Sequence, residues 1–211
     1  MSKIDNMINI DEDFDKAVQL AGKIYFGGGV FIYPTDTIYG FGANPFNEEA
    51  VRKVNEIKGR ESGKMFILLV KGIEDLLKYV DLKSEKHVDF LISIWPNPVS
   101  VVLNLNKKTQ HLLNRENAAF RIPNNRFCLR LLSEIKMPLI STSVNKSNQT
   151  PLVEPSQIAN EFASEVEAVF FTKKKSFFES STIIDLSGSK PELIREGKVK
   201  FEELLAKYEV K

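Results

Sequence analysis

The chain has 211 residues, 43% hydrophobic and 27% charged, which is the balance of an ordinary globular protein with a core of normal size. Its net charge of +1 provides no overall basic field for nucleic acid, so any anion site must be built from locally placed lysines and arginines. The single cysteine excludes an intrachain disulfide framework, and the polar N-terminus and lack of a long apolar run predict a cytoplasmic protein without a membrane span.

Apolar side chains recur at helix and strand spacings along the chain. Phe14, Ala17, Val18 and Ala21 are spaced as on one face of a helix. In chain order we predict a helix at 12–25, a strand at 30–33, a helix at 48–58, a strand at 65–70, helices at 73–80 and 84–94, a strand at 99–105, a helix at 127–135, a strand at 139–143, a helix at 155–162, strands at 169–171 and 182–186, and a helix at 201–208. Because no internal repeat or linker divides the chain, we expect one α/β domain with a mixed sheet over residues 1–211.

Two features resemble ligand sites but lack part of the required pattern. Residues 59–65, GRESGKM, are one residue too short between the glycines for a P-loop, and Met65 stands where a Mg²⁺-binding Ser or Thr is required. His87 and His111 are isolated and, with Cys128 as the one cysteine, form no recognisable zinc set. We therefore predict that the protein supplies no metal site of its own.

Three polar segments could carry chemistry, namely residues 33–46, 58–60 and 141–147. Each also has a structural explanation: a proline turn, cations at a helix C-terminus, and a turn of short polar side chains. Arg121 and Arg195 add two further cations beside expected strand ends. Taken together, hydroxyls, an amide and paired cations at strand ends suit a phosphorylated ligand at the edge of an α/β sheet.

The ordered motifs of the chain resemble those of the Sua5/YciO/YrdC family, and within it the threonylcarbamoyl-AMP synthases. The matching stretches are PTDTIYGFG, IKGR, WPNP, FRIP, STSVNKS, STIID and IREG, which occur in the family's order over most of the sequence. The resemblance implies a twisted open mixed α/β sheet flanked by helices, with a concave, positively charged groove.

The resemblance also implies an activity. Synthases of this family make threonylcarbamoyl-AMP from L-threonine, bicarbonate and ATP and release pyrophosphate, and partner proteins then transfer the threonylcarbamoyl group to adenosine 37 of tRNA. Mg²⁺ would arrive with ATP. The implied catalytic residues are Lys58 and Arg60; the implied ATP-binding residues are Lys58, Arg60, Ser143, Asn145 and Arg195; the implied threonine-binding residues are Thr35, Arg121 and Ser181.

These residue types suit that chemistry. Attack on the α-phosphate concentrates negative charge, which fixed lysines and arginines stabilise. The guanidinium of Arg121 can hold a carboxylate through two parallel hydrogen bonds. Thr35 would then face the substrate, and Gly40 and Gly42 would let the backbone approach it.

Four positions depart from the family pattern. Glu61 replaces a frequent proline, Asn97 and Asn148 replace glycines, and Leu69 lies near a histidine of some relatives. Asn97 could preserve its turn by adopting a left-handed conformation. Two alternatives therefore stay open: a non-catalytic module that binds tRNA or double-stranded RNA in the same groove, and a nucleotide-using relative with a different acceptor. The net charge of +1 argues against the first, and the retained Ser143 and Asn145 favour the synthase.

Overall fold

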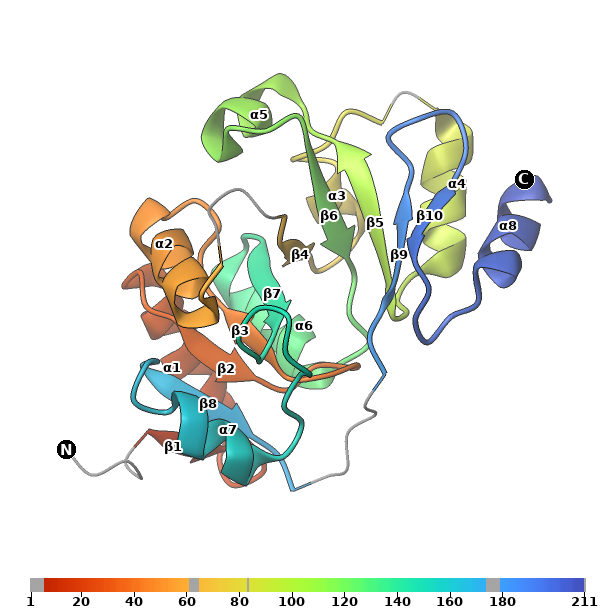
Figure 1. Cartoon of the computed structure of the whole chain (residues 1–211). Coiled ribbons are helices and arrows are strands. Elements are labelled where there is room, and N and C mark those ends of the chain that lie inside the picture. The colour runs from red at the N-terminus through yellow and green to blue at the C-terminus, as the bar shows by residue number, and fades with distance from the viewer. Residues whose placement is uncertain (1–5, 61–64, 83, 174–178, 211) are drawn as a thin grey trace.

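The computed structural model describes residues 6–60, 65–82, 84–173 and 179–210 (Figure 1). The helices are α1 (Phe14–Phe26), α2 (Glu48–Lys58), α3 (Ile73–Leu76), α4 (Glu85–Ile94), α5 (Lys107–Leu113), α6 (Arg126–Ile135), α7 (Pro155–Phe162) and α8 (Phe201–Glu209). The strands are β1 (Met7–Asn9), β2 (Phe31–Tyr33), β3 (Gly40–Gly42), β4 (Ile67–Leu69), β5 (Val99–Asn104), β6 (Asn117–Arg121), β7 (Leu139–Ser143), β8 (Ala168–Phe171), β9 (Thr182–Asp185) and β10 (Glu192–Arg195). Within these ranges, no helix is long and apolar enough to cross a bilayer.

The strands form one open, twisted, mixed sheet, which confirms the predicted fold class. Over the described residues its order is β1-β8-β2-β3-β7-β4-β6-β5-β9-β10. Strand β7 pairs antiparallel with β3 on one side and with β4 on the other, whereas β4 runs parallel to β6. In Figure 1, β1, β8, β2 and β3 lie at the lower left and β6, β5, β9 and β10 at the upper right, so β7 and β4 join the two halves.

Alternating side chains of the strands build two hydrophobic clusters on opposite faces of the sheet. Phe31 and Tyr33 of β2 pack with α1 and α6, while Ile32 between them belongs to the larger cluster on the other face. This alternation is the period-two pattern of a strand that is buried on both sides. The hydroxyl of Tyr25, in α1, donates to the carbonyl oxygen of Pro138 at 2.8 Å and ties that helix to the start of β7.

Several elements differ from the sequence prediction. No bounds were predicted for strands β1, β3, β6 and β10 or for helix α5, although strand ends were expected beside Arg121 and Arg195. Helix α3 ends at Leu76 rather than at residue 80. Strand β3 was missed because two glycines flank one apolar residue. A Cβ built at Gly42 would lie 2.6 Å from the Phe31 ring, so the packing of the core leaves space only for a residue without a side chain at this position. This packing gives a structural reason for Gly42, whose predicted role in approaching a ligand stays a prediction.

Candidate functional site

The end of helix α2 places Lys58 against the loop that follows β7. The helix stops because Gly59 takes a left-handed conformation, with φ of 58°. The Lys58 ammonium donates to the carbonyl oxygens of Ser143, at 2.6 Å, and Asn145, at 3.0 Å, and to Asn145 Oδ1 at 3.0 Å. Three of the predicted nucleotide-binding residues therefore lie in direct contact, although their contact with ATP stays a prediction.

Asn145 organises this loop. Its Oδ1 also accepts from the Ser143 hydroxyl at 2.6 Å, and its Nδ2 donates to the carbonyl oxygens of Lys146 and Gln149 at 2.9 and 2.7 Å. In return, the Ser147 amide donates to the carbonyl oxygen of Lys58 at 2.7 Å. The side-chain amide of Asn145 is thus hydrogen-bonded at both its oxygen and its nitrogen. The polar turn that the sequence suggested forms around this side chain.

Lys58 and Arg60 are neighbouring cations in a partly desolvated place. Burial, and then the charge of Arg60, lower the pKa of Lys58 to about 8. Burial, and then the charge of Arg115, lower the pKa of Arg60 to about 10. The Arg60 guanidinium donates to Asn55 Oδ1 at 2.8 Å and lies 3.9 Å from the centre of the Phe66 ring. An anion bound here would stabilise the charged forms of both side chains and so oppose the burial and the repulsion that lower these pKa values.

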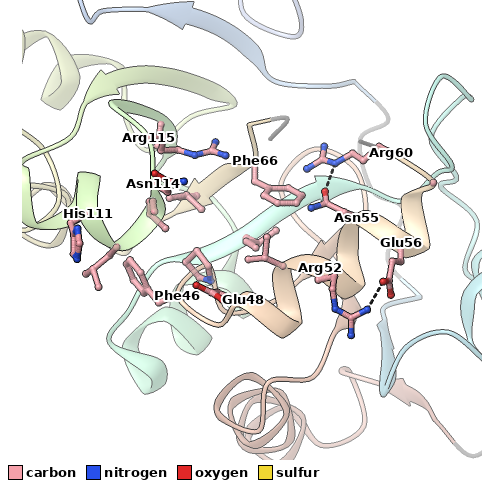
Figure 2. Close-up of a pocket in the computed structure, with 18 residues that line it drawn as sticks. Phe46, Glu48, Arg52, Asn55, Glu56, Arg60, Phe66, His111, Asn114 and Arg115 are labelled. Carbon is pink, nitrogen blue, oxygen red and sulfur yellow. Dashed lines mark hydrogen bonds and ion pairs between the residues drawn. The ribbon is translucent and has the colours of Figure 1, made fainter. Parts of the chain in front are cut away.

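A cavity of about 790 Å³ opens beside Arg60, between α2, α5, β4 and β6. Figure 2 shows Arg60 and Arg115 approaching Phe66 from opposite sides, with Phe46 further along the wall. Its size lies within the usual range for small-molecule sites, roughly 300–1,000 Å³. The sequence did not reveal this cavity, because about a third of its lining residues come from α5, the turn after it and β6, for which no elements were predicted.

A second polar cluster surrounds Arg121 at the end of β6. The residue is only 2% exposed. Its Nη1 donates to Thr37 Oγ1 at 3.1 Å, and its Nη2 lies 3.4 Å from Asp36 Oδ1. Among the described residues, neither Arg121 Nε nor Asp36 Oδ1 has a hydrogen-bond partner. Thr35, which is also buried, shares a 2.9 Å hydrogen bond with the Thr37 hydroxyl, so the predicted threonine-side residues Thr35 and Arg121 are linked through Thr37.

Ser181, the residue before β9, and Arg195, the last residue of β10, lie near Arg121. Arg195 Nη2 donates to the carbonyl oxygen of Ser181 at 2.8 Å, and the Ser181 hydroxyl lies 3.0 Å from that of Ser100. Partial desolvation, and then the charge of Arg121, lower the pKa of Arg195. The structure therefore brings Arg195, predicted on the nucleotide side, next to residues predicted on the threonine side.

The four departures from the family pattern have different outcomes. Asn148 is left-handed, with φ of 65°, whereas Asn97 is not among the described left-handed residues; its turn is closed by a 2.7 Å hydrogen bond from the Val99 amide to the Asn97 carbonyl. Leu69 is fully buried and in register with Arg121. Glu61 lies outside the described residues.

The sequence predicted no chemical role for Cys128 or the two histidines. Burial raises the pKa of the Cys128 thiol, which lies on α6 and belongs to the same hydrophobic cluster as Phe31 and Tyr33 of β2. His111 is exposed beside the cavity, and His87 is half-buried on α4. In the part of the chain that the structure describes, no three His, Cys, Asp or Glu side chains come together as a metal site.

Comparison with known proteins identifies the family of the chain and solved structures with a similar fold. The Sua5/YciO/YrdC family model, described as "Telomere recombination", matches residues 23–197. P. abyssi Sua5 complexed with L-threonine is 25% identical, with a TM-score of 0.87, over 95% of this chain and 60% of that protein, so this chain spans about three fifths of it. E. coli YciO shares the fold at 23% identity and a TM-score of 0.84, over 94% of this chain and 98% of that one. MTH1692 from Methanobacterium thermoautotrophicum is 28% identical, with a TM-score of 0.65, over 87% of each chain. The match over most of its length shows that this chain belongs to the Sua5/YciO/YrdC family.

Proposed function

We propose that the chain makes threonylcarbamoyl-AMP from L-threonine, bicarbonate and ATP, with release of pyrophosphate, for N6-threonylcarbamoyladenosine formation at tRNA position 37. The state of Arg121 carries the proposal. A guanidinium that is 2% exposed, with an unpartnered Nε among the described residues, has a donor available for a carboxylate. The similarity to P. abyssi Sua5, whose structure contains L-threonine, favours this amino acid as the ligand.

The charges around Arg121 suit an anionic substrate. Arg121 and Arg195 carry two positive charges, and Asp36 offsets only one of them at 3.4 Å from Arg121. The remaining positive charge matches the carboxylate of the amino acid. Thr35 and Ser181 supply hydroxyl groups at the same place, and these can hydrogen-bond the polar groups of the substrate.

The second cation pair suits the phosphates of ATP. Lys58 and Arg60 would stabilise the negative charge that develops on the α-phosphate, together with Arg195. The adenosine would occupy the 790 Å³ cavity, where the Phe46 and Phe66 rings offer apolar faces. Mg²⁺ would enter bound to the phosphates of ATP, since phosphate oxygens and water are its usual ligands in such sites.

Direct assay of the product tests the proposal. The protein is incubated with MgATP, bicarbonate and L-threonine, and threonylcarbamoyl-AMP and pyrophosphate are detected by mass spectrometry. We expect both products only when all three substrates are present. Arg121→Ala should abolish them, whereas Arg130→Ala, which removes an exposed arginine from α6, should not.

The same experiment separates the alternative functions. A folded protein that forms no adenylate but shifts tRNA or double-stranded RNA in a gel would support a non-catalytic RNA-binding module. Pyrophosphate release without a threonine adduct would indicate another acceptor. Adenylate formation would next be tested with the tRNA-modifying proteins that we expect to consume it.

A further inference from the structure

Asp36 belongs to the polar cluster around Arg121, where the proposed function uses it only to offset a positive charge. It lies in the segment after β2, and its side chain is only 7% exposed. Its Oδ2 accepts a hydrogen bond from the Asn124 amide at 3.2 Å. Its Oδ1 faces Arg121 Nη2 at 3.4 Å but is buried without a hydrogen bond among the described residues.

A buried ion pair with only a structural role would not be expected to leave polar atoms without hydrogen bonds. Buried ion pairs are tolerated when their geometry is good and their remaining lone pairs and protons are satisfied. Here one oxygen of Asp36 and one N–H of Arg121 are left over on the same pair. Because an unsatisfied buried polar atom costs free energy, both partners favour a third molecule that brings a donor and an acceptor.

The head group of a free α-amino acid has that combination, with an ammonium donor and a carboxylate acceptor on the same carbon. We infer that Asp36 binds the α-ammonium group of the amino-acid substrate while Arg121 binds its carboxylate; this inference rests on the proposed function. An acid without the amino group would leave Asp36 Oδ1 without a hydrogen-bond donor and would place a second carboxylate beside it. The pair would therefore select free amino acids over hydroxy acids and other simple carboxylates.

There is room beside Asp36 for such a group. Asp36 and Thr35 line a cavity of about 400 Å³ together with Asn97 and Asn124. Its wall is polar at these four residues and charged at Asp11, Arg126 and Lys198, so an ammonium group could approach the Asp36 side chain without crossing the hydrophobic core. Arg121 does not line this cavity and contacts Asp36 from the protein side. The neighbouring Thr35 would then lie next to the substrate, as the family resemblance implied.

Asp36→Asn is a suitable test, because it keeps the shape and an acceptor for the Asn124 amide while removing the charge. Binding of L-threonine and of 3-hydroxybutanoate, which lacks the α-ammonium group, is measured by calorimetry without ATP or bicarbonate. We expect wild type to prefer L-threonine by at least about tenfold, and Asp36→Asn to lose at least about tenfold in affinity for L-threonine but not for 3-hydroxybutanoate. Asp89→Asn, which removes an exposed carboxylate from α4, should behave as wild type.

Other outcomes overturn the inference. Unchanged binding of L-threonine by Asp36→Asn, or equal weakening of both ligands, would show that Asp36 only positions Arg121. If the melting temperature shows that Asp36→Asn does not fold, the same comparison is made with Asp36→Ser. Adenylate synthesis with unchanged threonine binding in the variant refutes the inference alone, whereas charge-dependent threonine binding without adenylate synthesis refutes the proposed function alone. Binding of neither ligand by wild type, together with no adenylate synthesis, refutes both, and the same lack of binding with adenylate synthesis refutes the inference alone.

Discussion

The titration of Lys58 should make the protein more stable as the pH rises above about 8. Its pKa is lowered from 10.5 to about 8 in the folded protein, by burial first and by Arg60 second. Below about pH 8, Lys58 is protonated in both the folded and the unfolded chain, so it contributes no pH dependence. Between about pH 8 and 10.5 the unfolded chain holds more protons than the folded one, so the free energy of unfolding should rise with pH.

The size of the effect follows from the two pKa values. The change from 10.5 to about 8 corresponds to about 3 kcal/mol when the transition is complete, and to roughly 2–3 kcal/mol at pH 10. Lys58→Met removes the titrating group but keeps a similar length. The free energy of unfolding of wild type should therefore increase, relative to Lys58→Met, by that amount between about pH 7 and pH 10.

Urea denaturation of both proteins across this pH range measures the difference. Buried tyrosines such as Tyr33, whose pKa is raised chiefly by burial, lower stability at high pH in both proteins and cancel in the comparison. Lys16→Met removes an exposed lysine of α1 and should give a curve parallel to wild type. Parallel curves for wild type and Lys58→Met would refute the reasoning, because Lys58 would then titrate alike in both states.

Three further changes test the site and the core. Arg121→Lys should raise the KM for L-threonine at least about tenfold and leave that for ATP within about twofold, because lysine lacks the fork that fits a carboxylate; titration of each substrate would show an effect on ATP if this is wrong. Asn145→Ala should lower the free energy of unfolding in urea by about 2–4 kcal/mol, since two loop carbonyls lose their donor, and a loss under about 0.5 kcal/mol would contradict its role in the loop. Gly42→Ala should cost about 1–3 kcal/mol through its 2.6 Å approach to the Phe31 ring. Gly188→Ala, where no described heavy atom lies within 4 Å of the new Cβ, should change stability by less than about 0.5 kcal/mol, and equal melting curves for the two would contradict the packing argument.

Long elements with regular apolar spacing were predictable from the sequence. Helix α2 was placed correctly at both ends, since Asn47 caps its first turn and Gly59 ends its last. Strand β10 was not, because all four of its residues are exposed, as an edge strand paired with the preceding β9 allows, so its sequence lacks the alternation of a half-buried strand. Helix α5 is only 7 residues long, from Lys107 to Leu113, which is too short for a clear period.

The candidate site divides in the same way. The motifs identified Lys58, Asn145 and Arg121, but they could not show whether each side chain faces a ligand or the protein. The structure shows Asn145 bonded to its own loop and Arg121 with a donor without a described partner. Such distinctions depend on contacts between segments far apart in the chain, as between Arg121 and Thr37, and sequence patterns report mainly local structure.

Positive charge at the Lys58 end of the site is oriented by neutral groups. The three acceptors around its ammonium are two carbonyl oxygens and an amide oxygen, which fix the position of the charge without neutralising it. A carboxylate partner at the same place would cancel much of the field that an incoming anion experiences. The lowered pKa of Lys58 reflects the free-energy cost of burying its charge and, second, of placing it near Arg60. An anion that binds nearby would raise that pKa again. Asn145 can therefore be important for anion binding without touching the ligand, because it holds the cation that the ligand meets.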